Sequence, residues 1–307
     1  MALTRIVSVR VGADLFVFAS EDGPIKWTKA ARAAAKFDGG DGHLATVTNA
    51  RQSNALQDAI DEHGGGFVGA SGPWIGLARA PDDDFEWVTG EAFRYSNWSP
   101  GEPNNFVTPE RWVQLWNGQA IWNDNDQSFP RESVFGYVVE LRQKAANVIN
   151  GTAGDDHIES GGGADRLKGR GGDDVLIAGA GKDRMQGQGG DDRLVGGPGD
   201  DLMQGQAGAD VLLGGGGKDR LIGGGGDDVL TGGKQADVFV FTARSGADVI
   251  KDFRVGLDVI ELKAANRLGD LSFEQVGDDV TVAFRGAQIT VENVEEEALR
   301  NSQNFDL

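Results

Sequence analysis

Aspartate recurs at every ninth position over a long central stretch of this chain. Between Gly151 and Val240, ten consecutive nine-residue blocks carry Asp at their sixth position, and glycine fills most of their first four positions. A carboxylate beside the inward-pointing carbonyl oxygens of a glycine turn offers the all-oxygen surroundings that calcium prefers. Asp237 holds the same place in the last block. The candidate calcium ligands are Asp156, Asp165, Asp174, Asp183, Asp192, Asp201, Asp210, Asp219 and Asp228.

A period this strict predicts a stack of similar units. The eighth position of every block is apolar, and this side chain is expected to point into the stack from a very short strand. One apolar side chain per nine residues buries little surface against the entropy of so much glycine. We therefore expect the stack to be loose without calcium and ordered with it, so that binding free energy becomes folding free energy.

These blocks, such as Gly223-Gly-Gly-Gly-Asp-Asp-Val-Leu230, resemble the RTX (haemolysin-type) repeat G-G-x-G-x-D-x-U-x, in which U is apolar. The resemblance implies a parallel β-roll in which two blocks make one coil and calcium lies between turns one coil apart. A flexible Gly/Asp-rich linker is the alternative, but a linker does not keep an apolar residue in frame ten times. The departures are Ser160 and Ala178 at the first position, Thr152, Arg170, Gln188 and Gln206 at the second, and Gln235 at the fourth.

Composition narrows the class of protein. The 307 residues carry a formal net charge of −19 and no cysteine, which argues against nucleic acid and anionic membranes as partners and excludes disulfides. No apolar run is long enough for a membrane span, and Asp14 interrupts the only candidate secretory signal. Weak calcium sites belong to extracellular modules, so we expect secretion without an N-terminal signal peptide.

The first half of the chain carries three ordered motifs and all seven tryptophans. Trp74-Ile-Gly-Leu77 predicts a short buried strand. Glu102-Pro-Asn104 is followed by Glu110, and Trp122-Asn-Asp124 lies on a late strand. The surrounding pattern predicts a helix over 27–37, a strand over 43–47, a helix from Asn49 or Ser53 to Ile60, and a closing strand over 136–141.

Over residues 6–142 this order resembles the C-type lectin-like domain. The resemblance implies a calcium site whose open coordination positions take two neighbouring sugar hydroxyls, and the Glu-Pro-Asn order implies mannose- or glucose-type glycans. The usual cysteines are absent, so packing by Trp112 and Trp116 is expected to replace them. The implied calcium and carbohydrate ligands are Glu102, Asn104, Glu110, Asn123 and Asp124.

The tail after the repeats alternates apolar and polar residues at 238–241, 280–284 and 289–291, which predicts strands that close the roll. The tail resembles the C-terminal region of RTX proteins secreted by bacterial type I exporters, with the acidic and apolar terminus Asn304-Phe-Asp-Leu307. The resemblance implies an uncleaved export signal and an exporter as a partner. An ordinary β cap without an export role is the alternative, and the two are compatible.

Patterns typical of enzymes are absent. The chain has no G-x-S-x-G elbow and no H-E-x-x-H, and Lys218 is not followed by Ser or Thr as a P-loop requires. We therefore predict no enzymatic activity. The predicted fold is an α+β C-type lectin-like domain (1–145), an all-β parallel β-roll (146–240) and a β-rich cap with the export region (241–307).

The predicted function is that of a secreted calcium-dependent carbohydrate-binding protein. Two alternatives remain at this point. One is an RTX adhesin or matrix protein whose lectin-like head binds a protein ligand, and the other is a structural matrix protein with an inert head.

Overall fold

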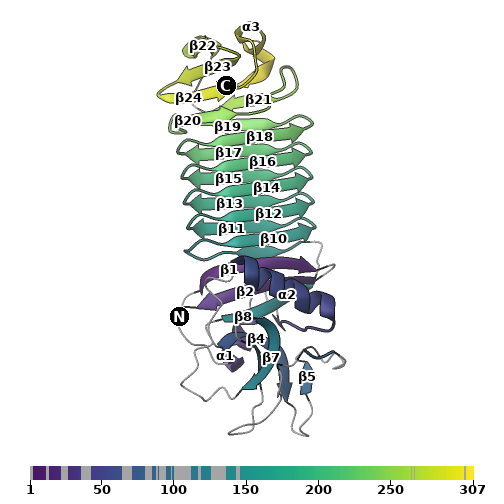
Figure 1. Ribbon diagram of the computed structural model, residues 1–307. Coiled ribbons are helices and arrows are strands. Elements are labelled where there is room, and N and C mark those ends of the chain that lie inside the picture. Colours follow the sequence, from purple (N-terminus) through teal and green to yellow (C-terminus); the bar gives the residue numbers. More distant parts are fainter. Residues whose placement is uncertain are drawn as a thin grey trace. The chain divides into compact units, whose positions relative to one another are not determined.

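In a computed structural model, the chain forms two compact units, residues 1–143 and residues 144–307. The second unit is described almost throughout, and the first in its helices and most of its strands (Figure 1). The structure describes residues 3–11, 14–21, 27–35, 43–63, 71–79, 85–87, 89, 95–97, 99, 112–116, 119–125, 136–142, 146–263, 265, 267–300 and 302–307.

Largely antiparallel strands form the framework of the first unit. The first two strands make a hairpin, and the last strand of the unit pairs with the second, so that Val17 lies opposite Val139. Strand β4 pairs with β5 and β6, and β6 pairs with β7. The strands are β1 (Leu3–Val11), β2 (Asp14–Glu21), β3 (His43–Leu44), β4 (Ser71–Arg79), β5 (Phe85–Trp87), β6 (Trp112–Trp116), β7 (Gln119–Asn125) and β8 (Gly136–Arg142).

The described part of this unit contains two helices, α1 (Trp27–Ala34) and α2 (Ala50–His63). Of the two predicted starts for the second helix, Asn49 is the correct one, because its side-chain oxygen accepts the Gln52 amide N–H at 3.0 Å. The Gln52 side chain in turn accepts the amide N–H of Thr48 at 2.8 Å. This reciprocal pair satisfies amide groups that a helix start leaves without a partner.

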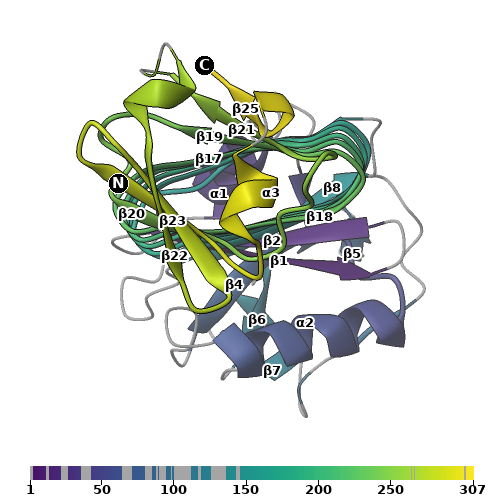
Figure 2. The same ribbon diagram turned by 90° about the horizontal axis from the view of Figure 1, so that it is seen from above.

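The second unit is a roll of two parallel sheets, and consecutive blocks contribute strands to the two sheets in turn (Figure 2). Paired residues are 18 apart, as Leu176 and Leu194 are, so two blocks make one coil and the predicted parallel β-roll is confirmed. The first sheet contains β10 (His157–Gly162), β12 (Val175–Ala180), β14 (Arg193–Pro198), β16 (Val211–Gly216) and β18 (Val229–Lys234). The second contains β9 (Val148–Asn150), β11 (Arg166–Gly171), β13 (Arg184–Gly189), β15 (Leu202–Ala207), β17 (Arg220–Gly225) and β19 (Val238–Phe241).

One ladder of apolar side chains from each sheet fills the interior of the roll. Leu194, Leu212 and Leu230 stack in the first sheet, and Met185, Met203 and Leu221 stack in the second; each is at most 1 % exposed. Burying one such side chain contributes roughly 2 kcal/mol. Ordering the nine backbone residues that carry it costs about 1 kcal/mol or more per residue. Burial of the two ladders therefore does not by itself offset the cost of ordering the coils, and other interactions must stabilise them.

The tail continues both sheets and covers the last coil with a β cap. Strands β20 and β24 extend the first sheet in parallel, and β23 and β22 follow as an antiparallel meander. Buried Phe253 lies against Phe239 of the last repeat, with ring centroids 6.2 Å apart. The elements are β20 (Ala247–Ile250), β21 (Val259–Leu262), η3 (Leu268–Asp270), β22 (Ser272–Val276), β23 (Asp279–Phe284), β24 (Ala287–Val291), α3 (Glu296–Leu299), η4 (Ser302–Asn304) and β25 (Phe305–Asp306).

Candidate calcium sites

The roll places its repeated aspartates in two rows, one in the turns along each edge. A turn precedes every strand, and the sixth residue of each block is the last before the strand begins. The first edge precedes the strands of the first sheet and contains Asp156, Asp174, Asp192, Asp210 and Asp228. Beyond the repeats, Asp248 continues this row as the second residue of β20. The second edge precedes the strands of the second sheet and contains Asp165, Asp183, Asp201, Asp219, Asp237 and Asp258.

Each aspartate joins its coil to the preceding one through its Oδ1 atom. The amide N–H of Asp174 donates to Oδ1 of Asp192, and the amide of Asp192 donates to Oδ1 of Asp210, at 2.9 and 2.8 Å. The same bond recurs along the second edge, for example from Asp183 to Asp201 at 2.8 Å. One oxygen of each carboxylate therefore has a fixed structural partner.

The second oxygen, Oδ2, has no protein partner over the interior of both rows. These side chains are buried, with residues such as Asp174 and Asp210 only 1 % exposed. A buried carboxylate oxygen without a donor is costly, and nine such atoms in register are the arrangement expected of cation ligands. The nine belong to Asp165, Asp174, Asp183, Asp192, Asp201, Asp210, Asp219, Asp228 and Asp248.

Glycine at the first position of a block leaves room beside this oxygen. A Cβ atom on Gly205 would lie 2.0 Å from Asp210 Oδ2 and 2.7 Å from the carbonyl oxygen of Gly223, one coil further on. A Cβ on Gly214 would meet Asp219 Oδ2 at 2.5 Å and the Gly232 carbonyl at 2.6 Å. Carboxylate and carbonyl oxygens from adjacent coils thus converge on one place, as the ligands of a hard cation do.

Burial raises the pKa of these carboxyl groups well above the ordinary value of 3.8, and neighbouring like charges add to the effect. The pKa of Asp174 and of Asp201 rises to about 7, and that of Asp248 to about 8. For Asp192 and Asp228 it rises to about 6. The amide N–H that donates to each Oδ1 opposes the shift without cancelling it. Metal-free carboxylates in this setting hold protons that a bound cation must displace.

This donor set fits calcium. Among the residues that the structure describes, no three carboxylate, imidazole or thiolate groups meet at one point, so backbone carbonyls must complete any coordination shell. Calcium accepts such mixed carboxylate and carbonyl shells, whereas zinc favours nitrogen and sulfur. When bound, the cation would supply two positive charges to the buried Oδ2 atoms and tie adjacent coils together.

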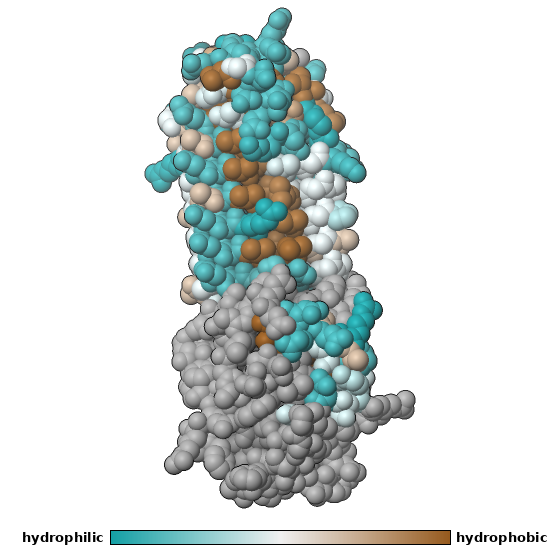
Figure 3. Space-filling view, viewed as in Figure 1, coloured by the Kyte–Doolittle hydropathy of each residue, from teal (hydrophilic) through white to brown (hydrophobic). Residues whose placement is uncertain are grey.

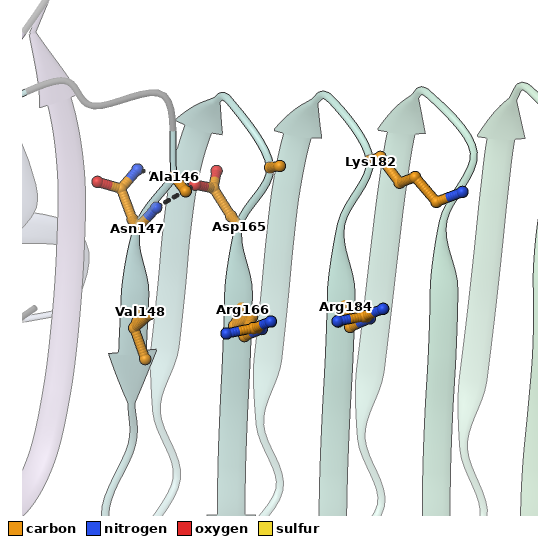
Figure 4. Close-up of a pocket in the computed structure, with 8 residues that line it drawn as sticks. Ala146, Asn147, Val148, Asp165, Arg166, Lys182 and Arg184 are labelled. Carbon is orange, nitrogen blue, oxygen red and sulfur yellow. Dashed lines mark hydrogen bonds between the residues drawn. The ribbon is translucent and has the colours of Figure 1, made fainter.

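At the N-terminal end of the roll, the two edges differ. On the second edge Asn147 holds the place of an aspartate, and its side-chain amide donates to Asp165 Oδ1 at 3.0 Å (Figure 4), while Asp165 Oδ2 remains without a protein donor. On the first edge the Thr152 amide donates to Asp156 Oδ2 at 2.5 Å, and the Thr152 hydroxyl lies 3.1 Å from the same atom. Asp156 was predicted as a calcium ligand, but the structure gives its Oδ2 a protein partner, unlike that of the interior aspartates.

At the C-terminal end of the second edge, Arg254 takes the same role. Its guanidinium Nη2 lies 3.1 Å from Asp237 Oδ2 and 2.8 Å from Asp258 Oδ1, and it also contacts the carbonyl of Gln235. Neither aspartate is among those with an orphaned Oδ2. The guanidinium therefore bridges two coils where a cation would otherwise lie, so the last coil of this edge is held together without metal.

Replacing Arg254 tests this substitution of guanidinium for metal. We expect Arg254→Gln to destabilise the metal-free roll by about 2 kcal/mol, because two buried carboxylates lose their charged hydrogen-bond donor. Calcium is expected to restore most of the lost stability of this variant, since the carboxylates of Asp237 and Asp258 are then free to bind it. Thermal unfolding with and without calcium measures both effects. The matched control is Arg244→Gln, at an exposed arginine three residues beyond the end of β19. Equal melting curves for the two variants would contradict the assignment.

The sequence prediction missed Asp248 and Asp258 as members of the two rows. The amide of Asp228 donates to Asp248 Oδ1 at 3.0 Å and that of Asp237 donates to Asp258 Oδ1 at 3.0 Å, as in the repeats. Asp248 follows Asp228 by 20 residues and Asp258 follows Asp237 by 21, instead of 18. Both therefore fall outside the nine-residue frame of the repeats. The signal that identifies them is the sequence Asp-Val-Ile, which follows the repeat pattern at 248–250 and again at 258–260.

Several non-glycine residues occupy glycine positions of the repeat at a conformational cost. Arg170, Gln188 and Gln206 have φ between 86° and 90°, and Gln235 has φ of 71°. Glycine adopts this region without penalty, whereas other residues do not. At the first position, Ala178 and Ser160 are buried, and the Ser160 hydroxyl donates to the Ala178 carbonyl at 2.8 Å. These substitutions leave the coil intact, but the Cβ atoms of Ser160 and Ala178 occupy the position at which glycine leaves room for a cation in other blocks, beside Asp165 and Asp183.

In the first unit, the structure describes the backbone of two of the five predicted lectin-type ligands. Asn123 and Asp124 lie in β7, opposite Gln114 and Val113 of β6. Glu102, Asn104 and Glu110 lie outside the described residues. The predicted site thus stays a prediction. No helix among the described segments is long and apolar enough to cross a membrane.

Comparison with protein families identifies both parts of the chain. The model described as Lectin C-type domain matches residues 24–134. The model for the RTX calcium-binding nonapeptide repeat matches residues 145–176, 168–203 and 204–239. Both resemblances found in the sequence are thereby confirmed. RTX repeats bind calcium and C-type lectin domains are calcium-dependent.

Individual relatives match a little over a quarter of this chain. Ladderlectin of Oncorhynchus mykiss is 37 % identical over 92 residues, which is 29 % of this chain and 47 % of that protein. C-type mannose receptor 2 of Rattus norvegicus is 35 % identical over 88 residues, 27 % of this chain and 5 % of that protein. The chain thus spans about half of the first relative or less. A crystal structure of the cow CD23 C-type carbohydrate-recognition domain, in the presence of a GlcNAc2Man3 oligosaccharide, matches 45 % of this chain and 94 % of that one, with 25 % identity and a TM-score of 0.35.

Proposed function

We propose that this chain, which joins a C-type lectin domain to RTX calcium-binding repeats, is a secreted protein that binds glycans through calcium. The observation that carries the proposal is the ordered set of five oxygen ligands within the part matched as a lectin domain. Glu102, Asn104 and Glu110 precede Asn123 and Asp124 of β7. Five protein residues leave calcium with open positions, which two sugar hydroxyls fill by coordinating the ion while they donate to Glu and accept from Asn.

The order Glu102-Pro-Asn104 supports mannose- or glucose-type sugars, with paired equatorial hydroxyls. Each contact is small and hydrated, so a single site binds weakly. The roll supports the same function in a different way: weak calcium sites fill only where calcium is abundant, which favours folding outside the cell. The protein is proposed to act by binding and not by catalysis.

A glycan array with and without chelator tests the proposal. We expect calcium-dependent signals for mannose and glucose, and we expect Asn104→Asp or Glu110→Ala to reduce them at least tenfold, because each removes one oriented group from the ion and the sugar. Asn54→Asp makes the same chemical change at an exposed position of α2 and is expected to leave binding unchanged. Calcium-independent binding to a protein ligand would point to the adhesin alternative, and silence in both assays would point to an inert head.

Residues 241–307 are proposed to carry the type I export region as well as the cap. The strands of the cap continue both sheets of the roll, which accounts for their fold but not for the acidic and apolar terminus. Fusion of this segment to a passenger protein in cells with a type I exporter tests the proposal. Retention of the passenger in the cells would oppose it.

A further inference from the structure

The outer face of the second sheet carries a regular array of basic and amide side chains. Strands β11, β13 and β15 each turn three side chains outward, and the parallel register aligns them in three columns. We call this array the cationic grid. Its columns are Arg166, Arg184 and Leu202; Lys168, Gln186 and Gln204; and Arg170, Gln188 and Gln206.

The grid is positively charged in a chain whose net charge is −19. Arg166, Lys168, Arg170 and Arg184 are exposed, and no acidic residue belongs to the grid. Within the part of the chain that the structure describes, none of these four cations pairs with a carboxylate, whereas Arg220 on the next strand pairs with Glu261 at 2.6 Å. The four charges are therefore available to a partner.

The first sheet differs in kind. Its outward positions are mostly apolar and hold Val175, Ile177, Val195, Val211 and Leu213, with exposed Arg193 between Val175 and Val211. A band of apolar side chains runs along the roll in Figure 3. The repeat itself accepts any residue at its seventh and ninth positions. The concentration of arginine, lysine and glutamine on one sheet is thus a property of this chain and not a requirement of the coil.

Two shallow hollows lie along the Arg166 column. One, of about 390 Å³, is lined by Asn147, Val148, Arg166, Lys182 and Arg184 among others (Figure 4). The other, of about 340 Å³, is lined by Arg166, Lys168, Arg184, Gln186, Leu202 and Gln204. Arg166 and Arg184 lie side by side on neighbouring strands and border both hollows. The surface therefore offers an open track beside a row of cations, with Lys182 adding a fifth charge at the turn.

We propose that the cationic grid binds a carboxylated polysaccharide, such as a polyuronate, laid across the strands. Guanidinium groups pair with carboxylates through two parallel hydrogen bonds. The glutamine amides donate to and accept from sugar hydroxyls, and the Gln186 amide already donates to Gln204 at 2.9 Å in a continuous row. Adjacent strands are about 4.8 Å apart. Neighbouring side chains of one column are therefore separated by about the length of one sugar unit of the polysaccharide.

The same chemistry disfavours a nucleic acid as the occupant. Single strands are held by stacking their bases on aromatic side chains, and the grid contains no aromatic residue. Exposed Asp173 and Asp191 flank the Arg170 end, and exposed Asp200 lies in the turn before β15 at the Arg166 end, so a polyanion is expected to lie across the middle of the strands. The site lies outside the lectin-type ligands, so it is independent of the proposed glycan site of the head.

Binding of a labelled hexagalacturonate to the full chain in saturating calcium tests the inference. Fluorescence anisotropy is expected to show binding that weakens with salt, and no binding of the fully methyl-esterified oligomer, which has the same sugars without charge. The triple variant Arg166→Gln, Lys168→Gln and Arg184→Gln is expected to lose at least tenfold in affinity. The control variant Arg193→Gln, Lys234→Gln and Arg244→Gln removes three exposed cations outside the grid and is expected to lose less than twofold.

The outcomes separate the grid from the head. Asn104→Asp is expected to retain hexagalacturonate binding, and the grid variant is expected to retain mannose binding and an unchanged calcium titration by circular dichroism. Equal losses in the two triple variants, or equal binding of the esterified oligomer, would overturn the inference. So would tighter binding of a thymidine hexanucleotide, which would favour a nucleic acid on this face.

Discussion

Gly205→Ala is expected to destabilise the calcium-loaded roll by about 3 kcal/mol and to remove one calcium site. The added Cβ would lie 2.0 Å from Asp210 Oδ2 and 2.7 Å from the Gly223 carbonyl oxygen. Both atoms are proposed calcium ligands, and the Asp210 carboxylate is held in place through its Oδ1 atom, which accepts the Asp192 amide. The methyl group therefore fills the space that the cation needs. Calorimetric titration gives the number of bound ions, and thermal unfolding in calcium gives the stability.

Gly216→Ala is the matched control. This glycine ends β16, has no heavy atom within 4 Å of the new Cβ, and is absent from the residues with positive φ. We expect a change within about 0.5 kcal/mol and the full number of bound ions. If the two variants lost stability equally, the first glycine of the block would serve only the backbone, and the proposed cation site at Asp210 would be wrong.

Without metal, the roll is expected to become more stable as the pH falls from 8 to 5. The pKa of Asp174 and Asp201 is raised to about 7, and that of Asp248 to about 8, against 3.8 in the unfolded chain. Between these values the folded state binds more protons than the unfolded state, so stability decreases as pH rises through the folded pKa. Acidification therefore neutralises, by protonation, the same carboxylates that calcium would neutralise.

In saturating calcium this pH dependence is expected to weaken. Protons and calcium compete for the same Oδ2 atoms, so the calcium affinity of the folded roll should fall as the pH falls below about 7. Far-ultraviolet circular dichroism in calcium-depleted buffer, from pH 8 to pH 4.5, reports the roll. Because all seven tryptophans lie between Trp27 and Trp122, tryptophan fluorescence reports the first unit separately. A metal-free roll that loses order on acidification would contradict the account.

A neighbouring pair of aspartates gives the control for this prediction. Burial raises the pKa of Asp192 to about 6, whereas Asp191 is exposed. Asp192→Asn keeps an acceptor for the Asp174 amide and removes the buried charge, so it is expected to stabilise the metal-free roll at pH 8 by on the order of 2 kcal/mol. Asp191→Asn is expected to change it by less than about 0.5 kcal/mol. Calcium affinity should fall only in the first variant.

The roll was predictable from the sequence because its geometry repeats with the chain. One apolar residue and one aspartate every nine residues define both the ladder of the core and the rows at the edges, as Leu194 and Asp192 illustrate. Strand direction, pairing of residues 18 apart and inward-pointing carboxylates all follow from that period. The cap strands β23 and β24 were also visible in their alternation.

The ends of the roll were not predictable in the same way. Arg254 lies 17 residues beyond Asp237 and outside the repeat frame, so only the stacking of coils shows that its guanidinium reaches that carboxylate. Asp248 follows an insertion of two residues, which breaks the period on which the prediction depended. Asn147 precedes the first block and joins the second edge through a bond to Asp165. Such contacts depend on which turns become neighbours, not on local sequence.

Hydrogen exchange of residues 156–248 in the full chain, with calcium and with chelator at neutral pH, tests most directly whether a cation bridges the coils. The amides of the aspartate rows donate to carboxylates one coil away, so they are protected only while the coils are stacked. The account predicts strong protection in calcium, little in chelator, and no rescue by magnesium, which demands a more rigid shell. Equal protection of these amides in calcium and in chelator would contradict it.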